Sequence, residues 1–348
     1  MGDCLSGYFV VYLTIGKFLF FNAVGVSGKT GSMSMAMASM QTTIHSLALD
    51  TPLMNAAGVW CTTTDELQAV AAGDTGAVVT KSMTLNPREG NICPRYAADT
   101  VCSVNSMGLP NHGVEYYCGG AAALQKSRKP IIASIAGFRE EEYSTLLERV
   151  CREPFDAVEI NLSCPNVEGK EIFAYDLEAA SRILERLRAM TDKLLGVKLP
   201  PYSRRSEISA VGQRLVDLGI NFVTVVNSYP LGTIIDAQTR RLQIVPNGGI
   251  GGLGGKALKP IALSHVLLFS QACQGKVAII GAGGVETGTD VAEYLLAGAS
   301  AVQVGTALYT EGPSIFERLT SELTQYCDKN GISRIADIIG TVASASSV

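Results

Sequence analysis

The chain has 348 residues, of which 47% are hydrophobic and 17% charged, so it can bury a large core as one α/β barrel or as two average domains. Its net charge is −4 and its lysines and arginines are scattered, which excludes the basic surface expected of a nucleic-acid-binding protein. Nine cysteines without a CxxC pair predict reduced thiols and a cytoplasmic location, while three histidines at no ligand spacing predict no metal site.

Residues 1–43 differ from the rest of the chain. Residues 8–26 are apolar apart from Lys17, and residues 27–43 show no core pattern. One interpretation is a disordered or non-native leader, with the true start at a later methionine. The other is a membrane tether, because MGDCLS matches the myristoylation pattern and Cys4 could carry a second acyl chain. We therefore expect membrane contact only if this leader is retained, and a single catalytic domain over residues 44–348.

From Pro52 onward, short apolar runs alternate with longer amphipathic segments. The apolar runs predict eight strands, at residues 52–58, 76–82, 130–137, 156–163, 194–200, 222–228, 277–284 and 301–307. The amphipathic segments predict helices at residues 63–73, 140–153, 175–193, 206–219, 259–275, 286–298 and 312–331. This alternation predicts a parallel (β/α)8 TIM barrel with its active site at the carboxyl ends of the strands.

Lys81 and Lys198 are unusual because each ends a predicted apolar strand. A single lysine at such a position can simply reach solvent. Two lysines directed into the same barrel mouth favour an anion or a cofactor instead.

The segment GIGGLG, residues 249–254, matches the dinucleotide-binding fingerprint. That fingerprint also needs an acidic residue about 20 positions later, and none occurs between Gly251 and Val285, so we reject a Rossmann site. The glycines after the last two predicted strands, in GAGG (281–284) and VGTA (304–307), predict a phosphate cradle instead. Tight turns between strand and helix are the alternative interpretation of each segment taken singly.

The hexapeptide NLSCPN, residues 161–166, places Cys164 in a polar loop directly after a predicted strand. Asparagine side chains carry both donors and acceptors, so Asn105, Asn161, Asn166 and Asn227 could bracket a planar ring such as a cyclic imide. With the phosphate cradle and the two lysines, they suggest bound FMN and a small polar substrate. The alternative for Cys164 is a buried, inert thiol.

Several separate motifs resemble those of the class 1A dihydroorotate dehydrogenases. They are NLSCPN, MNAAGV (54–59), NSMGLPN (105–111), GVKLPPY (196–202), GGLGGK (251–256) and AGASAVQVGTALYTEGPSIFERL (297–319). The resemblance extends from about residue 44 to the end of the chain. It implies a TIM barrel with FMN at its carboxyl face, which oxidises (S)-dihydroorotate to orotate in de novo pyrimidine (UMP) biosynthesis. It also implies that fumarate is reduced to succinate at the same site, and that the enzyme is a cytoplasmic homodimer.

The resemblance assigns roles to individual residues. Cys164 would be the general base, Lys198 would lie beside flavin N1 and O2, and Lys81 would meet both the substrate carboxylate and the flavin. The other implied substrate-binding residues are Asn105, Met107, Gly108, Leu109, Asn161, Asn166, Asn227 and Ser228. The implied FMN-binding residues are Ala56, Ala57, Gly58, Lys81, Ser82, Asn105, Asn161, Lys198, Val226, Ser228, Gly254, Gly255, Gly283, Gly284, Gly305 and Thr306. The loop after Cys164 would be a lid, with Glu168 and Glu171 where the family usually has prolines.

Two alternatives remain open at this point. The first is the NAD-linked class of the same family, which uses a cysteine base and passes electrons to a partner subunit carrying FAD and an iron–sulfur cluster. The second is a non-catalytic flavin-binding barrel that retains the pocket for sensing.

Overall fold

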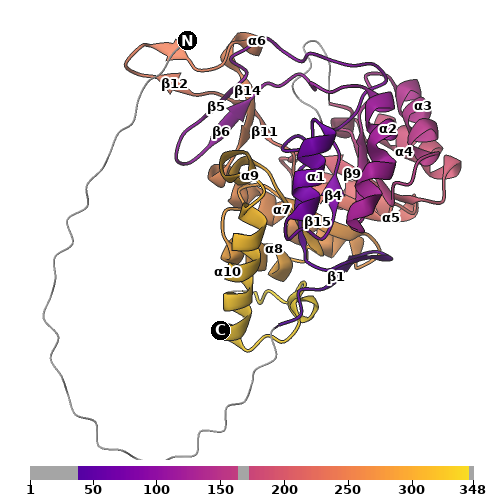
Figure 1. Ribbon diagram of the computed structural model, residues 1–348, viewed down its shortest axis with the longest axis vertical. Helices are drawn as coiled ribbons and strands as arrows, with labels where there is room; N and C mark the ends of the chain where they lie inside the picture. The colour runs from indigo at the N-terminus through magenta and orange to yellow at the C-terminus, as the bar shows by residue number, and fades with distance from the viewer. Residues whose placement is uncertain (1–37, 164–171, 345–348) are drawn as a thin grey trace, which may run out of the picture. The chain divides into compact units, whose positions relative to one another are not determined.

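The structure, a computed structural model, describes residues 38–163 and 172–344 (Figure 1). Eight parallel strands form one sheet in the order β3-β16-β15-β10-β9-β8-β7-β4, and a parallel bridge between Met54 and Ala77 links the first strand to the last. The strands are β3 (Leu53–Asn55), β4 (Val78–Val79), β7 (Ile131–Ile135), β8 (Ala157–Asn161), β9 (Leu194–Leu199), β10 (Phe222–Val225), β15 (Ala278–Ala282) and β16 (Ala301–Val304). The predicted TIM barrel is confirmed, with all eight strands inside the predicted ranges.

Helices follow the strands and flank the sheet (Figure 1). They are α1 (Thr64–Ala72), α2 (Val114–Leu124), α3 (Glu140–Cys151), α4 (Leu177–Met190), α5 (Arg205–Asp217), α7 (Lys259–Cys273), α8 (Gly288–Leu296) and α10 (Ile315–Asn330). Capping residues set where several of them begin: Thr63 and Thr287 each form a capping box at the starts of α1 and α8. Of these helices only α2 is missing from the sequence-based prediction, because its glycine-containing sequence VEYYCGGAAAL has a weak amphipathic pattern.

An antiparallel sheet lies over the carboxyl end of the barrel, where Figure 1 shows β5, β6, β11 and β14 together. Its strands are β5 (Tyr96–Ala98), β6 (Ser103–Asn105), β14 (Gly251–Gly254) and β11 (Tyr229–Gly232). The segment GIGGLG therefore forms part of a strand rather than a strand-to-helix turn, which agrees with the rejection of a Rossmann site. The remaining elements are a β12 (Ile235–Asp236) and β13 (Arg241–Leu242) ladder, α6 (Pro246–Gly249), α9 (Thr306–Glu311), η1 (Gln125–Ser127), η2 (Phe173–Tyr175), η3 (Lys256–Leu258) and η4 (Ile335–Ile338).

A short hairpin of β1 (Thr42–Ile44) and β2 (Leu47–Leu49) covers the amino end of the barrel. Ile44 and Leu49 are buried in an apolar cluster with residues of the barrel strands. Ser39 precedes the hairpin and its N–H donates to the Ser333 carbonyl oxygen at 2.9 Å, so packing begins at or before this residue. Across residues 38–163 and 172–344, no helix combines the length and apolar character needed to cross a bilayer.

Candidate active site

A cavity of about 560 Å³ lies at the carboxyl ends of the barrel strands. Residues at or just beyond the ends of β3, β4, β8, β9, β10, β15 and β16 line it, and the β5–β6 hairpin and β14 contribute the rest. Its volume is in the range of cavities that bind a cofactor or a small ligand. Because the carboxyl ends of a TIM barrel carry its active site, this cavity is the candidate site.

Every residue predicted for the site that the structure describes lines this single cavity. These residues are Ala56, Ala57, Gly58, Lys81, Ser82, Asn105, Met107, Gly108, Leu109, Asn161, Lys198, Val226, Asn227, Ser228, Gly254, Gly255, Gly283, Gly284, Gly305 and Thr306. Cys164 and Asn166 lie outside the described residues, as do Glu168 and Glu171 of the expected lid. The individual roles assigned by resemblance stay predictions.

Two lysine side chains line the cavity although both are buried. Lys81 and Lys198 are 5% and 4% exposed. Lys81 Nζ donates to the Gly58 carbonyl oxygen at 3.2 Å, and Lys198 Nζ donates to Gln303 Oε1 at 3.0 Å. Burial lowers the pKa of Lys198, while the nearby Glu159 carboxylate acts in the opposite direction. Positive charge on buried side chains favours a ligand that is anionic or that gains electron density.

Two asparagine amides are held in fixed orientations at the same level. Asn161 Nδ2 donates to Ser82 Oγ at 3.0 Å, and Asn161 Oδ1 accepts from the N–H and hydroxyl groups of Ser163. Asn227 Nδ2 donates to Ser163 Oγ at 2.9 Å, and its Oδ1 accepts from the Ser228 N–H at 2.8 Å. Since each amide has distinct partners on its two sides, its donor and acceptor ends are defined before a ligand binds. Ser163, the last described residue before Cys164, therefore hydrogen-bonds both amides that line the cavity.

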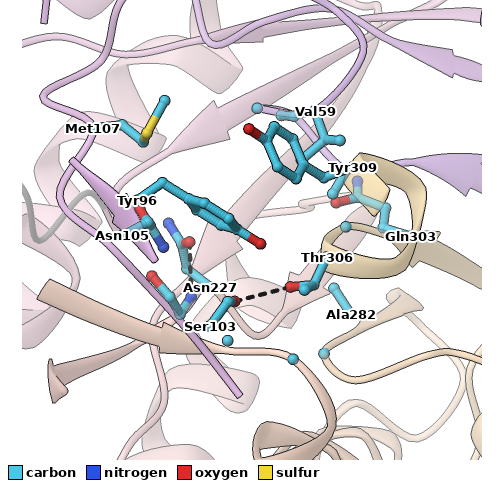
Figure 2. A pocket seen from close by; sticks show the side chains of 18 of the residues that line it. Val59, Tyr96, Ser103, Asn105, Met107, Asn227, Ala282, Gln303, Thr306 and Tyr309 are labelled. Carbon is cyan, nitrogen blue, oxygen red and sulfur yellow. Dashed lines mark hydrogen bonds between the residues drawn. The ribbon is translucent and has the colours of Figure 1, made fainter. Parts of the chain in front are cut away.

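Glycines allow the backbone to approach a ligand at one end of the cavity. Gly284 has a φ of +65°, and a Cβ on it would lie 2.8 Å from the Gly255 carbonyl oxygen. A Cβ on Gly254 would lie 2.9 Å from Ser103 Oγ, which pairs with Thr306 Oγ1 at 3.1 Å (Figure 2). Backbone N–H groups and hydroxyls without intervening side chains suit a phosphate. These residues thus fit the phosphate of FMN, and the two lysines fit its ring.

Two described cysteines lie close to this site. Cys61 is buried behind it, where its Sγ accepts the Gly58 N–H at 3.1 Å and its carbonyl oxygen accepts the Lys81 N–H at 3.3 Å. Burial raises the pKa of the Cys61 thiol, so this thiol suits a packing and positioning role rather than proton transfer. Cys93 lines the outer rim of the cavity and is exposed.

Several lining residues were not predicted: Val59, Cys93, Pro94, Arg95, Tyr96, Ser103, Leu258, Ala282, Gln303 and Tyr309. Tyr96 and Tyr309 come from distant parts of the chain, yet their ring centroids are 4.7 Å apart at the side of the cavity (Figure 2). No sequence pattern indicates such a pairing. Gln303 did carry a signal, since it is a polar residue in the middle of the apolar run AVQVGTA.

Comparison with known proteins agrees with this site. A sequence model of the family described as dihydroorotate dehydrogenase matches residues 39–327. The chain is 42% identical over 309 residues to dihydroorotate dehydrogenase A (fumarate) of Lactococcus lactis subsp. lactis, an alignment that covers 88% of this chain and 99% of that protein. It is also 42% identical over 301 residues to dihydroorotate dehydrogenase (fumarate) of Kluyveromyces lactis, covering 85% of this chain and 96% of that protein.

A solved structure has a similar fold. The dihydroorotate dehydrogenase of Eimeria tenella, determined in complex with ferulenol, superposes with a TM-score of 0.70 at 25% sequence identity. The superposition covers 87% of this chain and 88% of that one. From the family match, the level of identity and the extent of coverage together, this chain belongs to the dihydroorotate dehydrogenase family.

Proposed function

We propose that this chain oxidises (S)-dihydroorotate to orotate in pyrimidine biosynthesis, with FMN as the cofactor and with fumarate as the electron acceptor. The observation that carries the proposal is the gathering of two buried lysines, oriented asparagine amides and a glycine cradle in one cavity of about 560 Å³. Relatives over nearly the whole catalytic region are named as fumarate-using dihydroorotate dehydrogenases.

Each side chain then has a defined task. The Cys164 thiolate accepts the C5 proton of dihydroorotate, while Asn161 and Asn227 hydrogen-bond the polar edges of the pyrimidine ring. Backbone N–H groups of residues 107–109 and the Lys81 ammonium bind the substrate carboxylate. FMN, when bound, supplies the acceptor for the hydride that leaves C6. A lid formed by the segment after Cys164, which lies outside the described residues, would exclude water from the site during this step.

The residues that would hold FMN divide into two groups. Backbone N–H groups of the Gly254–Gly255 and Gly283–Gly284 turns, with the hydroxyl of Thr306, would bind the phosphate. At the other end, Lys198 would place its ammonium beside the part of the ring that gains negative charge on reduction.

The proposal is tested by steady-state turnover of the purified chain without any partner protein. Under anaerobic conditions, orotate should accumulate from dihydroorotate when fumarate is present and should not accumulate when NAD replaces it. Turnover only with NAD and an added electron-transfer subunit would support the NAD-linked alternative. No orotate with either acceptor would support the non-catalytic flavin-binding barrel.

We further propose that the protein is a homodimer whose interface includes β11, β12, β13 and α6. Large apolar side chains are exposed there: Leu231 is 83% exposed and Ile235 62%, with Leu242 and Val245 beside them in the chain. Such exposure is typical of a surface that a partner covers. Light scattering should give twice the chain mass for the native protein and the single chain mass for a Leu231→Asp, Ile235→Asp double variant. A native monomer would contradict the proposal.

We also propose a cytoplasmic location. The seven cysteines in the described ranges are all free thiols, which is the state expected in a reducing compartment. Whether residues 1–37 are retained, and whether they contact a membrane, stay predictions.

A further inference from the structure

A buried carboxyl group lies in the barrel interior beneath the candidate site. Glu159, in the middle of β8, is 0% exposed and does not line the cavity. Thr224 Oγ1 donates to its Oε2 at 2.8 Å, and two further donors reach the same carboxyl group, so it is surrounded by hydrogen-bond donors. A carboxylate, which can only accept hydrogen bonds, is satisfied by neighbours that all donate. A buried carboxylate without a counter-charge destabilises the folded state, so a positive charge is expected nearby.

The first hydrogen-bond chain from Glu159 ends on Lys198. Gln303 Nε2 donates to Glu159 Oε2 at 2.9 Å, and Gln303 Oε1 accepts from Lys198 Nζ at 3.0 Å. The Gln303 amide can satisfy both neighbours in only one orientation, with its NH2 group on the carboxylate and its oxygen on the ammonium. Gln303 is among the side chains that line the cavity (Figure 2), so this bridge connects the barrel interior with the site.

The second chain ends on Asn161. Ser134 Oγ donates to Glu159 Oε1 at 3.2 Å and lies 2.9 Å from Ser82 Oγ. With the Ser134 proton directed at the carboxylate, Ser82 donates to Ser134 and its lone pairs face Asn161 Nδ2, which lies 3.0 Å away. The acceptor at the bottom of the chain thus fixes the direction of every hydrogen bond above it.

We propose that Glu159 is a positioning residue: it is the buried counter-charge that keeps Lys198 an ammonium through Gln303. Through Ser134 and Ser82 it also supports the orientation of the Asn161 amide, which the Ser163 N–H fixes from the other side. The assignment of Lys198 and Asn161 to ligand binding rests on the proposed function, but the charge relation between Glu159 and Lys198 does not.

The charges around Lys198 support this relation. It is faced by Glu159 from β8, by the Cys61 thiol from the loop after β3, and by the Lys81 ammonium from the end of β4. Burial and the Lys81 charge both lower the pKa of Lys198, and Glu159 is the strongest opposing influence. Removing the Glu159 charge therefore removes the main influence that favours the ammonium form of Lys198.

The test is a titration of Lys198 itself, which needs no substrate. The full chain is labelled with [ε-13C]lysine, the Lys198 resonance is assigned by its loss in Lys198→Met, and its pH midpoint is followed by NMR. Glu159→Gln should lower the midpoint by about one unit or more, a tenfold loss of proton affinity. Glu159→Asp, which restores the charge, should return the midpoint most of the way, and the exposed Glu141→Gln control should leave it unchanged.

A Glu159→Gln midpoint equal to that of the native protein would overturn the proposal. So would an equal fall in Glu159→Asp, because the role would then be one of shape rather than charge. If neither Glu159 variant folds, Gln303→Met tests the bridge: the midpoint should fall, and an unchanged midpoint would contradict the relay. A protein that fails to oxidise dihydroorotate would leave these readings intact, so the two proposals can fail separately.

Discussion

The two ends of the barrel use the same eight strands but present opposite chemistry. At the amino end, the β1–β2 hairpin covers a cluster of apolar side chains: Ile44, Leu49, Met54, Ala77, Val79, Ile132, Ala157, Phe222, Ile280 and Ala301. At the carboxyl end, buried lysines, serines and asparagines surround a cavity of about 560 Å³. The amino end buries an apolar core, and the carboxyl end arranges polar groups around a cavity.

The barrel thus places stabilising apolar packing at one end and ligand-binding groups at the other. Apolar packing at the amino end supplies stability that does not depend on a ligand. The carboxyl end holds charges whose favourable contacts are completed only when a ligand binds, so its arrangement serves preorganisation. Substitutions at the amino end should therefore lower the free energy of unfolding and leave the rate of flavin reduction unchanged. Substitutions at the carboxyl end should lower that rate and leave the free energy of unfolding nearly unchanged.

The largest expected effect is at the carboxyl end, from Cys164→Ala. Loss of the proposed general base should slow flavin reduction by dihydroorotate about 100-fold to 10,000-fold, with thermal stability nearly unchanged. Anaerobic stopped-flow absorbance measures the rate. Cys151→Ala, on the remote helix α3, is the matched control and should react like the native protein. A near-normal rate in Cys164→Ala would remove this thiol from the mechanism.

The next effect, at the amino end, is the converse. Phe222 is fully buried in the apolar cluster, and a Cβ on Gly196 of the neighbouring strand would lie 2.1 Å from its ring. Phe222→Ala should lower the free energy of unfolding by about 3–5 kcal/mol, because it leaves a cavity that the strands cannot close. Urea denaturation measures this loss. The folded variant should reduce its flavin at the native rate, and a large drop in that rate would show that the two ends are not independent.

A third change returns to the carboxyl end. Lys198→Met keeps the length of the side chain but removes the ammonium that donates to Gln303. The rate of flavin reduction should fall about 100-fold, the scale of one lost electrostatic group in a preorganised site. Lys126→Met, at an exposed position, is the control. If Lys198→Met and the control react equally fast, the cation has no part in the step.

The smallest effect lies between the two ends, in the helical layer. His265 on α7 accepts the Tyr202 N–H at Nε2 (2.8 Å), and burial lowers the pKa of His265. The unfolded chain, with a histidine pKa of about 6.5, then binds the proton more readily than the folded chain. Neutral His265 therefore stabilises the folded state fully above about pH 6.5. This stabilisation is lost as the pH falls through the lowered pKa of His265.

Thermal unfolding across this pH range measures the contribution. His265→Gln should have a shallower fall in Tm on acidification than the native protein. The exposed His112→Gln control should keep the native slope. Identical slopes for all three proteins would exclude His265 as a source of acid sensitivity.

The barrel could be predicted from the sequence because parallel strands that are buried on both faces appear as apolar runs, and amphipathic helices separate them. The β1–β2 hairpin and the four-stranded sheet over the cavity could not be predicted from the sequence. Their strands have three or four residues, too few to establish a period, and pairs such as Ser103 with Gly254 are distant in the sequence. Tertiary contacts, rather than local pattern, determine these elements.

The site was only partly predictable for a similar reason. Many of the predicted residues stand at the ends of barrel strands, where position alone indicates the cavity. Others, such as Met107 and Gly255, were implied only by the family resemblance. Glu159 and Gln303 stand inside apolar runs, where each appears as an isolated polar residue in a strand. That anomaly is visible in the sequence, but the meeting of the two side chains inside the barrel depends on the order of strands β8 and β16 around it.

The central claim is that dihydroorotate delivers its electrons to a flavin held at the polar end of this barrel. The most direct test mixes the flavin-loaded protein with dihydroorotate in the absence of oxygen while the visible flavin absorbance is recorded. The account predicts that the flavin band bleaches and that added fumarate restores it. A band that persists unchanged in excess dihydroorotate would contradict the account.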